Sequence, residues 1–333
     1  MGTVTGVAGL LKKIFIDVPI EIIKKIHFWC FNVIGMYLSF LYIPYHYLYV
    51  LPHLRIGNDG RVGIMQVNSY VVPGCNLRCE FCAAFSAYQK GIFSADELIA
   101  SYVEWRKKIK PQFFVLSGGE PLLHPELERI VRESAKIWND SKLWLGTNGL
   151  LLERLKPEIL QALRETGFTL FVTEHTFDPE HHKKLEAGCN RLKREKIPFF
   201  VRPSRQIWAE RYRYKMGKSE EGEREQIVPF NSNPKKAFFN PGNFCYCPSI
   251  RGDELYKCGY LCSVSRLVSG GALNADNWKA ALSYVPLTLR SSSAEILEHL
   301  RRSGIPECTV CPGSNHIVPA RQLSVQNRIR VKL

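Results

Sequence analysis

The sequence predicts an α/β fold built on a mostly parallel sheet. Between residues 62 and 203, short apolar segments rich in Val, Leu and Phe alternate with longer amphipathic segments. This alternation is typical of βα units, in which helices cover the parallel strands and bury them on both faces. The chain has 333 residues, 45% of them hydrophobic, which suffices for one large core or two unequal ones.

The predicted elements follow one another in regular order. Strands are expected at 62–70, 113–117, 142–146, 168–173 and 198–202. The helices between them are expected at 95–110, 125–139, 156–165 and 179–195. The first helix starts after Ser94, because Glu97 stands three residues later in a capping-box pattern. Beyond 204 the alternation stops. There, 205–218 is predicted to be a solvated helix face, or alternatively a grip for a phosphate or nucleobase, and 219–226 an exposed loop or helix end.

Three cysteines follow the first predicted strand. Cys75, Cys79 and Cys82 have the spacing C-x3-C-x2-C. Three thiolates suit a [4Fe–4S] cluster in which one iron keeps no protein ligand. A zinc site would normally take a fourth ligand, and residues 83–91 contain neither Cys nor His. The spacing therefore indicates an iron–sulfur cluster rather than a zinc knuckle.

Two further motifs stand where predicted strands end. The strand at 113–117 runs into Gly118-Gly-Glu-Pro121, and the strand at 142–146 runs into Thr147-Asn-Gly149. Glycines allow a close approach of the backbone, and a glutamate can accept hydrogen bonds from an ammonium group. Together with the cysteine loop, these motifs resemble the radical S-adenosylmethionine (SAM) superfamily over roughly residues 62–203.

The resemblance implies a partial (βα)6 barrel, similar to a TIM barrel but open on one side, with its site at the carboxyl ends of the strands. It implies that Cys75, Cys79 and Cys82 ligate a catalytic [4Fe–4S] cluster that chelates SAM. A 5′-deoxyadenosyl radical would then remove hydrogen from an unactivated carbon. The SAM-binding residues it implies or suggests are Phe81 beside the adenine, Gly118, Gly119, Glu120, Pro121, Thr147, Asn148, Thr173, Glu174 and Arg202. His175, His181 and His182 lie near the cofactor in this scheme, although a solvated helix start also explains the last two.

The last third of the chain contains a second group of cysteines. Cys245, Cys247, Cys258 and Cys262 surround Gly252, and Cys308 and Cys311 form a later C-x2-C pair. The arrangement resembles the auxiliary-cluster extensions of radical SAM enzymes, of the twitch or SPASM type. The ligand set this favours for a second [4Fe–4S] cluster is Cys247, Cys258, Cys308 and Cys311, with Cys245 as the substitute. Cys262 would enlarge the set, and a structural zinc site is the alternative.

The first 55 residues form a separate segment. Residues 10–25 have the period of an amphipathic helix, and 26–51 is almost uncharged and rich in aromatics. Asn32, Pro44 and His46 interrupt that stretch, so a helix that dips into one leaflet fits better than a full span. A helical layer packed on the barrel or in a dimer contact is the alternative. The predicted organisation is 1–55 helical segment, 56–230 radical SAM barrel and 231–333 cysteine-rich auxiliary domain.

Composition and resemblance together set the functional expectation. The net charge of +14 favours acidic partners such as phosphates, anionic lipid or an acidic peptide, and no nucleic-acid-binding motif is visible. Reduced cluster ligands place the protein in the cytoplasm, with peripheral or monotopic attachment to the inner face of a membrane. The expected activity is oxidation or crosslinking of a peptide, with an external flavodoxin-like or ferredoxin-like one-electron reductant. The alternatives are a membrane-associated enzyme for a small molecule or lipid precursor, and a non-catalytic iron–sulfur or zinc scaffold.

Overall fold

The structure is a computed structural model, and it describes most of the chain from residue 46 onward. The described residues are 43, 46–175, 178–202, 207–219, 222–240, 243, 245–314, 317–319 and 325–327. The predicted amphipathic helix at 10–25 and most of the apolar stretch 26–51 lie outside them. Within the described ranges, no helix combines the length and apolar character needed to cross a membrane.

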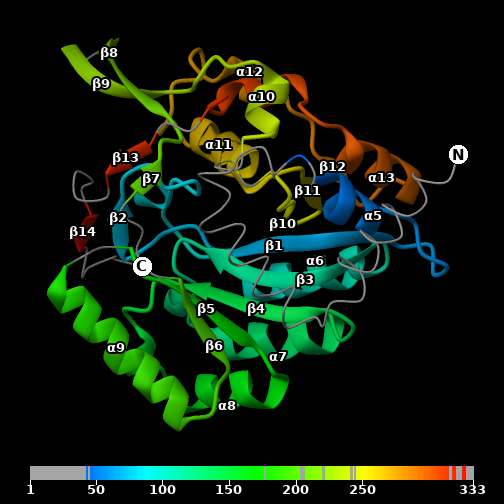
Figure 1. Ribbon diagram of the computed structural model, residues 1–333, viewed down its shortest axis with the longest axis vertical. Helices are drawn as coiled ribbons and strands as arrows, with labels where there is room; N and C mark the ends of the chain where they lie inside the picture. The colour runs from blue at the N-terminus through cyan, green and yellow to red at the C-terminus, as the bar shows by residue number, and fades with distance from the viewer. Residues whose placement is uncertain are drawn as a thin grey trace, which may run out of the picture.

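An eight-stranded sheet forms the centre of the molecule (Figure 1). Its order is β12-β11-β10-β1-β3-β4-β5-β6. The strands are β1 (Val62–Val72), β3 (Ile109–Gly118), β4 (Lys142–Thr147), β5 (Thr169–Thr173), β6 (Phe199–Arg202), β10 (Ser249–Arg251), β11 (Glu254–Tyr256) and β12 (Leu287–Thr288). The run from β10 to β6 is parallel, whereas β11 and β12 add antiparallel strands at one edge. This confirms the predicted α/β fold with a largely parallel sheet.

The helices that connect the parallel strands match their predictions closely. They are α6 (Ala95–Arg106), α7 (Leu127–Ile137), α8 (Pro157–Thr166) and α9 (Pro179–Arg194). The Ser94 hydroxyl accepts a hydrogen bond from the Glu97 N–H, which fixes the start of α6 as predicted. The end of α6 was predicted too late, because Pro111 biases the residue before it towards an extended backbone and β3 already begins at Ile109.

The two faces of the sheet differ in character. One face packs against α6, α7 and α8 in a continuous apolar core, in which the Phe114 ring stacks on Trp138 with centroids 4.8 Å apart (Figure 1). On the other face, the Trp144 ring lies 4.5 Å from the Phe113 ring and 5.4 Å from the Phe200 ring. Polar residues follow towards the carboxyl ends of the strands, where Tyr70 on β1 stands beside Ser117 on β3 in the sheet register. The inner face therefore has an apolar floor and a polar upper end.

The region after β6 departs from the prediction. Residues 207–228 contain β7 (Ile207–Ala209), β8 (Arg213–Ser219) and β9 (Gly222–Val228) instead of a helix face and an exposed loop. β8 and β9 pair as an antiparallel hairpin that extends from the body of the molecule (Figure 1). The period of two in Arg213-Tyr-Lys-Met is a strand pattern, and the register sets Tyr214 opposite Ile227. The helical prediction for this segment was therefore wrong.

The cysteine-rich region returns to the barrel. It contains α10 (Pro234–Phe238), α11 (Gly259–Ser269), α12 (Lys279–Leu282) and α13 (Ser293–Arg301) besides β10 and β11. The glycine among the later cysteines, Gly252, lies in the hairpin β10–β11, in the left-handed region at φ 57°. β10 pairs with β1 through Asn68↔Ser249 and Ser69↔Ile250. The predicted auxiliary region thus supplies strands to the main sheet.

Short elements tie both ends of the described chain to this body. The π-helical turn His46–Val50 and the single turn α5 (Leu51–His53) precede β1. β2 (Leu77–Cys79) pairs with β14 (Val325–Asn327), and β7 pairs with β13 (Ile317–Pro319). The cysteine loop after β1 is therefore paired with a segment close to the C-terminus.

Candidate cofactor site

The first three cysteines lie together in the loop that follows β1. Burial raises the pKa of the Cys75 thiol to about 12. Burial also raises the pKa of Cys79 well above its usual value, and the neighbouring Cys82 and Cys75 raise it further. The predicted ligands are thus brought within electrostatic reach of one another. Iron would replace the thiol protons, so loading of a cluster at this loop releases protons.

Hydrogen-bond donors already point at the Cys75 sulfur. The Leu77 N–H donates to Cys75 Sγ over 3.4 Å, and the Asn148 side-chain amide approaches the same sulfur at 3.6 Å. Asn148 also donates to the Asn76 side-chain carbonyl at 2.7 Å. Such donors stabilise a thiolate and are a common feature around cluster sulfurs. The donor set therefore fits Cys75 as a cluster ligand and places Asn148 beside it.

Gly118 and Gly119 bring the end of β3 onto the backbone before Cys75. A Cβ on Gly119 would lie 1.8 Å from the Gly74 carbonyl oxygen, and one on Gly118 would lie 2.2 Å from the Val72 carbonyl oxygen. The Gly119 N–H donates to Val72 O over 2.7 Å, and the Glu120 N–H to Gly74 O over 3.0 Å. The close approach that was predicted towards a ligand is made here towards the chain's own backbone. Any side chain at Gly119 would displace the cysteine loop.

The Glu120 carboxylate joins the ends of β3 and β4. It is fully buried and accepts hydrogen bonds from the Leu122 N–H at 3.0 Å, the Thr147 hydroxyl at 2.8 Å and the Asn148 N–H at 2.8 Å. Burial raises its pKa to about 7, and these hydrogen bonds oppose the rise. A carboxylate has about four acceptor positions, so roughly one remains. Pro121, buried as well, begins the short turn that follows.

The Phe81 ring packs in the cysteine-rich half of the molecule. It is 8% exposed, and its centroid lies 5.2 Å from that of Tyr212. Its backbone has a positive φ of 54°, and its N–H donates to the Tyr212 hydroxyl at 2.9 Å. The ring predicted to lie beside adenine therefore has tyrosine neighbours. Tyr212 was missed in the sequence because its segment was predicted to be a helix.

The ends of β5 and β6 carry the remaining predicted residues. Thr173 pairs with Arg202 across the two strands, and both are partly exposed. Glu174 is 2.7 Å from His182 Nδ1, and this contact raises the pKa of His182. His175 Nδ1 lies 3.8 Å from Cys79 Sγ. Of the three predicted histidines, His175 is therefore the one that reaches the cysteine loop.

Four of the later cysteines form a second group. Burial raises the pKa of Cys245 well above its usual value, and the thiols of Cys308, Cys311 and Cys258 raise it further. Burial and the same neighbours, Cys258 and Cys308, also raise the pKa of Cys311. In the described part of the chain, no three His, Cys, Asp or Glu side chains are arranged to hold a single metal ion.

Cys247, preferred over Cys245 in the sequence, has Gln66 and Cys258 as neighbours rather than Cys308 and Cys311. Gln66 on β1 donates a hydrogen bond from Nε2 to Cys247 Sγ over 3.3 Å. Burial raises the pKa of Cys247 to about 12, and Cys258 is the one thiol that contributes to the rise. Cys247 thus lies against the inner face of the barrel. Cys245 lies beside Cys308 and Cys311, in the place that was predicted for Cys247. Because Cys245 and Cys247 are only two residues apart, the sequence gave no means of choosing between them as a cluster ligand.

A buried lysine and a buried histidine border the second cysteine group. Lys257 is 4% exposed and donates from Nζ to the carbonyl oxygens of His299 at 2.9 Å and Leu300 at 2.8 Å. Burial lowers the pKa of Lys257 to about 8. Burial, together with the positive charge of Lys257, lowers the pKa of His46 to about 4. The sequence marked His46 only as a break in the apolar stretch 26–51 and gave no signal for Lys257, because the neighbours of both residues are distant along the chain.

Comparison with known proteins adds to this geometry. Residues 69–197 match the family model of the Radical SAM superfamily. This likeness to the superfamily covers somewhat more than a third of the chain. The matched range includes the cysteine loop, the Gly118–Pro121 turn and Asn148, the residues that the structure brings together at the carboxyl ends of β1, β3 and β4.

Curated relatives resemble about a third of this chain. A GTP 3',8-cyclase of Aquifex aeolicus is 35% identical over 116 residues, which cover 33% of this chain and 35% of the relative. A probable GTP 3',8-cyclase of Methanococcus maripaludis (strain C7) is 35% identical over 127 residues, which cover 36% of this chain and 39% of the relative. The chain thus matches less than half the length of these relatives.

Two solved structures are also similar to this chain over most of its length. The crystal structure of BtrN in complex with AdoMet and 2-DOIA has a TM-score of 0.43 at 13% identity and covers 75% of this chain and 94% of BtrN. The structure of SuiB from Streptococcus suis bound to the precursor peptide SuiA has a TM-score of 0.40 at 11% identity and covers 77% of this chain and 73% of SuiB.

Proposed function

We propose that the protein is a radical SAM enzyme. The observation that carries the proposal is the convergence of Cys75, Cys79 and Asn148 within the range that matches the superfamily. With a [4Fe–4S] cluster and SAM bound, this site would supply a 5′-deoxyadenosyl radical that removes a hydrogen atom from carbon. Cys82 would be the third cluster ligand.

The chain's own residues would hold and orient these groups. Glu120 would fix the ends of β3 and β4, and its remaining acceptor position suits the ammonium group of SAM. Thr173 and Arg202 lie at the neighbouring strand ends, where a guanidinium can pair with the SAM carboxylate. The Phe81 ring, packed on Tyr212, would support the loop that carries Cys79 and Cys82.

The second cysteine group would hold an auxiliary [4Fe–4S] cluster. Its ligands would be Cys245, Cys258, Cys308 and Cys311, because the last three thiols raise the pKa of Cys245 and those of Cys258 and Cys308 raise the pKa of Cys311. Such a cluster, in a twitch-like or SPASM-like extension, would accept an electron from the substrate or anchor it. A flavodoxin-like or ferredoxin-like protein would supply electrons from outside.

The substrate class stays a prediction. The peptide predicted from the sequence and a small molecule would both meet the polar upper end of the barrel, where Gln66, Asn68 and Tyr70 line β1. The names of the curated relatives add a nucleoside triphosphate as a candidate. We place the nucleotide first for testing, because the positive charge of the chain suits a triphosphate. Membrane attachment rests on residues 10–51, most of which lie outside the described ones.

The first experiment measures iron, sulfide and zinc in protein reconstituted without oxygen, alongside SAM cleavage after reduction. About eight irons per chain, with 5′-deoxyadenosine formed, would support the two-cluster enzyme. The Cys75→Ala, Cys79→Ala, Cys82→Ala variant should lose SAM cleavage and keep about four irons. Zinc in place of the second four irons would make the second site structural. A wild-type protein that holds iron but never cleaves SAM would contradict the enzyme proposal and favour the non-catalytic scaffold.

A further inference from the structure

The His46 side chain is buried without a hydrogen-bond partner. It is 2% exposed, and neither ring nitrogen has a partner among the described residues. The ring stacks on Tyr246 with centroids 5.2 Å apart and meets the edge of Phe238 at 5.4 Å. A neutral imidazole has one N–H donor and one acceptor nitrogen. Buried polar groups in folded proteins normally find partners, so this ring indicates a partner that the described residues do not supply.

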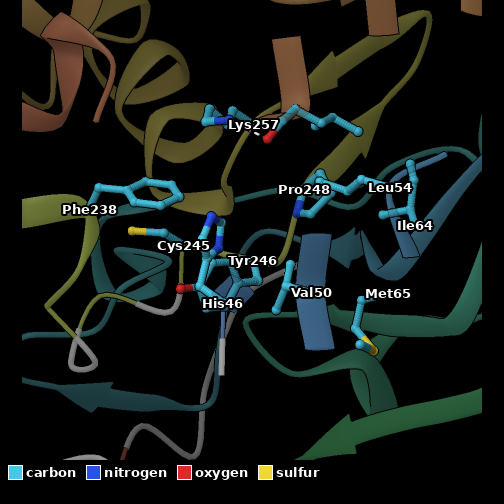
Figure 2. A pocket seen from close by; sticks show the side chains of 11 residues that line it. His46, Val50, Leu54, Ile64, Met65, Phe238, Cys245, Tyr246, Pro248 and Lys257 are labelled. Carbon is cyan, nitrogen blue, oxygen red and sulfur yellow. Dashed lines mark hydrogen bonds between the residues drawn. The ribbon is translucent and has the colours of Figure 1, made fainter. Parts of the chain in front are cut away.

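The pocket beside His46 is shared with the second cysteine group. It is lined by His46, Cys245 and Lys257 together with apolar side chains, and Figure 2 shows the three around one space. Its volume of about 20 Å³ is enough for one water molecule. Cys245 and Cys308 also pack against the apolar cluster of Val50, Phe238 and Tyr246. The turn His46–Val50 therefore packs against one side of the second cysteine group.

An iron–sulfur cluster on these cysteines would provide what His46 lacks. A protonated thiol is a weak acceptor, whereas a thiolate bound to iron carries negative charge and accepts strongly. Lys257, the charged residue of the pocket, already donates to two backbone carbonyls and is not a hydrogen-bond acceptor. The sulfur of Cys245 is thus the acceptor that cluster loading would create beside the ring.

We propose that His46 donates a hydrogen bond to the sulfur shell of the auxiliary cluster at Cys245, directly or through one water, and thereby sets its reduction potential. Hydrogen bonds to cluster sulfurs stabilise the more negative, reduced state and raise the potential. The turn before β1 would then be a functional part of the auxiliary site, in which His46 is a positioning residue. This inference rests on the proposed second cluster.

The test uses the Cys75→Ala, Cys79→Ala, Cys82→Ala protein, in which the auxiliary cluster is the one that remains. His46→Phe keeps an aromatic ring and removes both nitrogens, and His46→Gln keeps an N–H donor. Tyr47→Phe is the matched control, because its ring also contacts His46, at 5.1 Å, but it lies on the exposed side of the turn. The midpoint potential is measured by EPR-monitored titration, with iron and sulfide content determined on the same samples.

His46→Phe should lower the midpoint potential at unchanged iron content, His46→Gln should restore part of the difference, and Tyr47→Phe should leave it unchanged. An unchanged potential in His46→Phe would overturn the inference. So would loss of the iron in His46→Phe, because that would make His46 a ligand or a structural requirement. If the three-cysteine variant itself holds no iron, the proposed second cluster fails instead. Should that variant not fold, the two-cluster protein with His46→Phe must show one of its two midpoint potentials lowered.

Discussion

Cys245 and Cys247 are two residues apart, but their thiols meet different neighbours. Cys245 lies with Cys308 and Cys311, whereas Cys247 accepts a hydrogen bond from Gln66 on the barrel wall. In the protein without the first three cysteines, we expect Cys245→Ala to abolish iron binding and Cys247→Ala to retain about four irons per chain. Iron and sulfide analysis of the two variants decides between them. The reverse result would restore the ligand set predicted from spacing.

Glu120 makes the stability of the metal-free protein depend on pH. Its pKa is about 7 in the folded protein against 4.5 as the reference value, and burial is the main cause. Between these pH values the folded state keeps a proton that the unfolded state has lost. Stability therefore falls as pH rises through this window, by on the order of 3 kcal/mol in all.

Glu120→Gln removes the ionisable group and should flatten this part of the profile. The measurement is the midpoint of thermal unfolding at about pH 5 and about pH 7.5, followed by circular dichroism. Glu158→Gln, on the exposed first turn of α8, is the control and should keep the wild-type slope. Equal slopes in wild type and Glu120→Gln would show that the buried carboxyl does not control this dependence.

At the scale of elements, the end of β3 acts as a support for the cysteine loop. A Cβ on Gly119 would lie 1.8 Å from the Gly74 carbonyl oxygen, a distance that requires backbone movement. We expect Gly119→Ala to reduce iron at the first site strongly and to leave the second site loaded. Iron analysis combined with SAM cleavage measures both.

Gly60→Ala is the matched control for that substitution. Gly60 has a φ of 74°, and an added Cβ would meet nothing within 4 Å. The control thus carries only the left-handed backbone strain of about 1 kcal/mol. It should keep both clusters, whereas loss of iron in both variants would point to general destabilisation.

The elements that could be predicted are those with a local signal. β4 and α8 were placed within a residue or two because apolar periodicity, Pro157 and the following turn residues all agree. The strand β10 spans three residues, too few to show a period, and its partner in β1 is far away in the sequence. The same limit applies to the candidate site. Motifs identified the first cysteines, but Tyr212 and His46 depend on tertiary packing that no local pattern reports.

At the scale of the whole molecule, the barrel and the cysteine-rich region share one sheet and a second apolar core. Phe81 and Phe85 of the cysteine loop pack with Tyr212, Tyr260 and Trp278. Two parts joined by a sheet and a core should unfold together. We predict one denaturant transition for the metal-free protein, with the same midpoint for hydrogen exchange in β3 and in α11. Two separate midpoints would favour an independently folded auxiliary domain.

The pairing of β1 with β10 has a consequence for synthesis of the chain in the cell. β1 acquires its neighbour β3 early, but its other edge stays unpaired until residues 249–251 have left the ribosome. An exposed strand edge is a template for pairing with other chains, and slow long-range closure prolongs that exposure. Newly made protein should therefore depend on chaperones until the hairpin β10–β11 arrives. Slower growth at low temperature should raise its soluble yield more than added iron does.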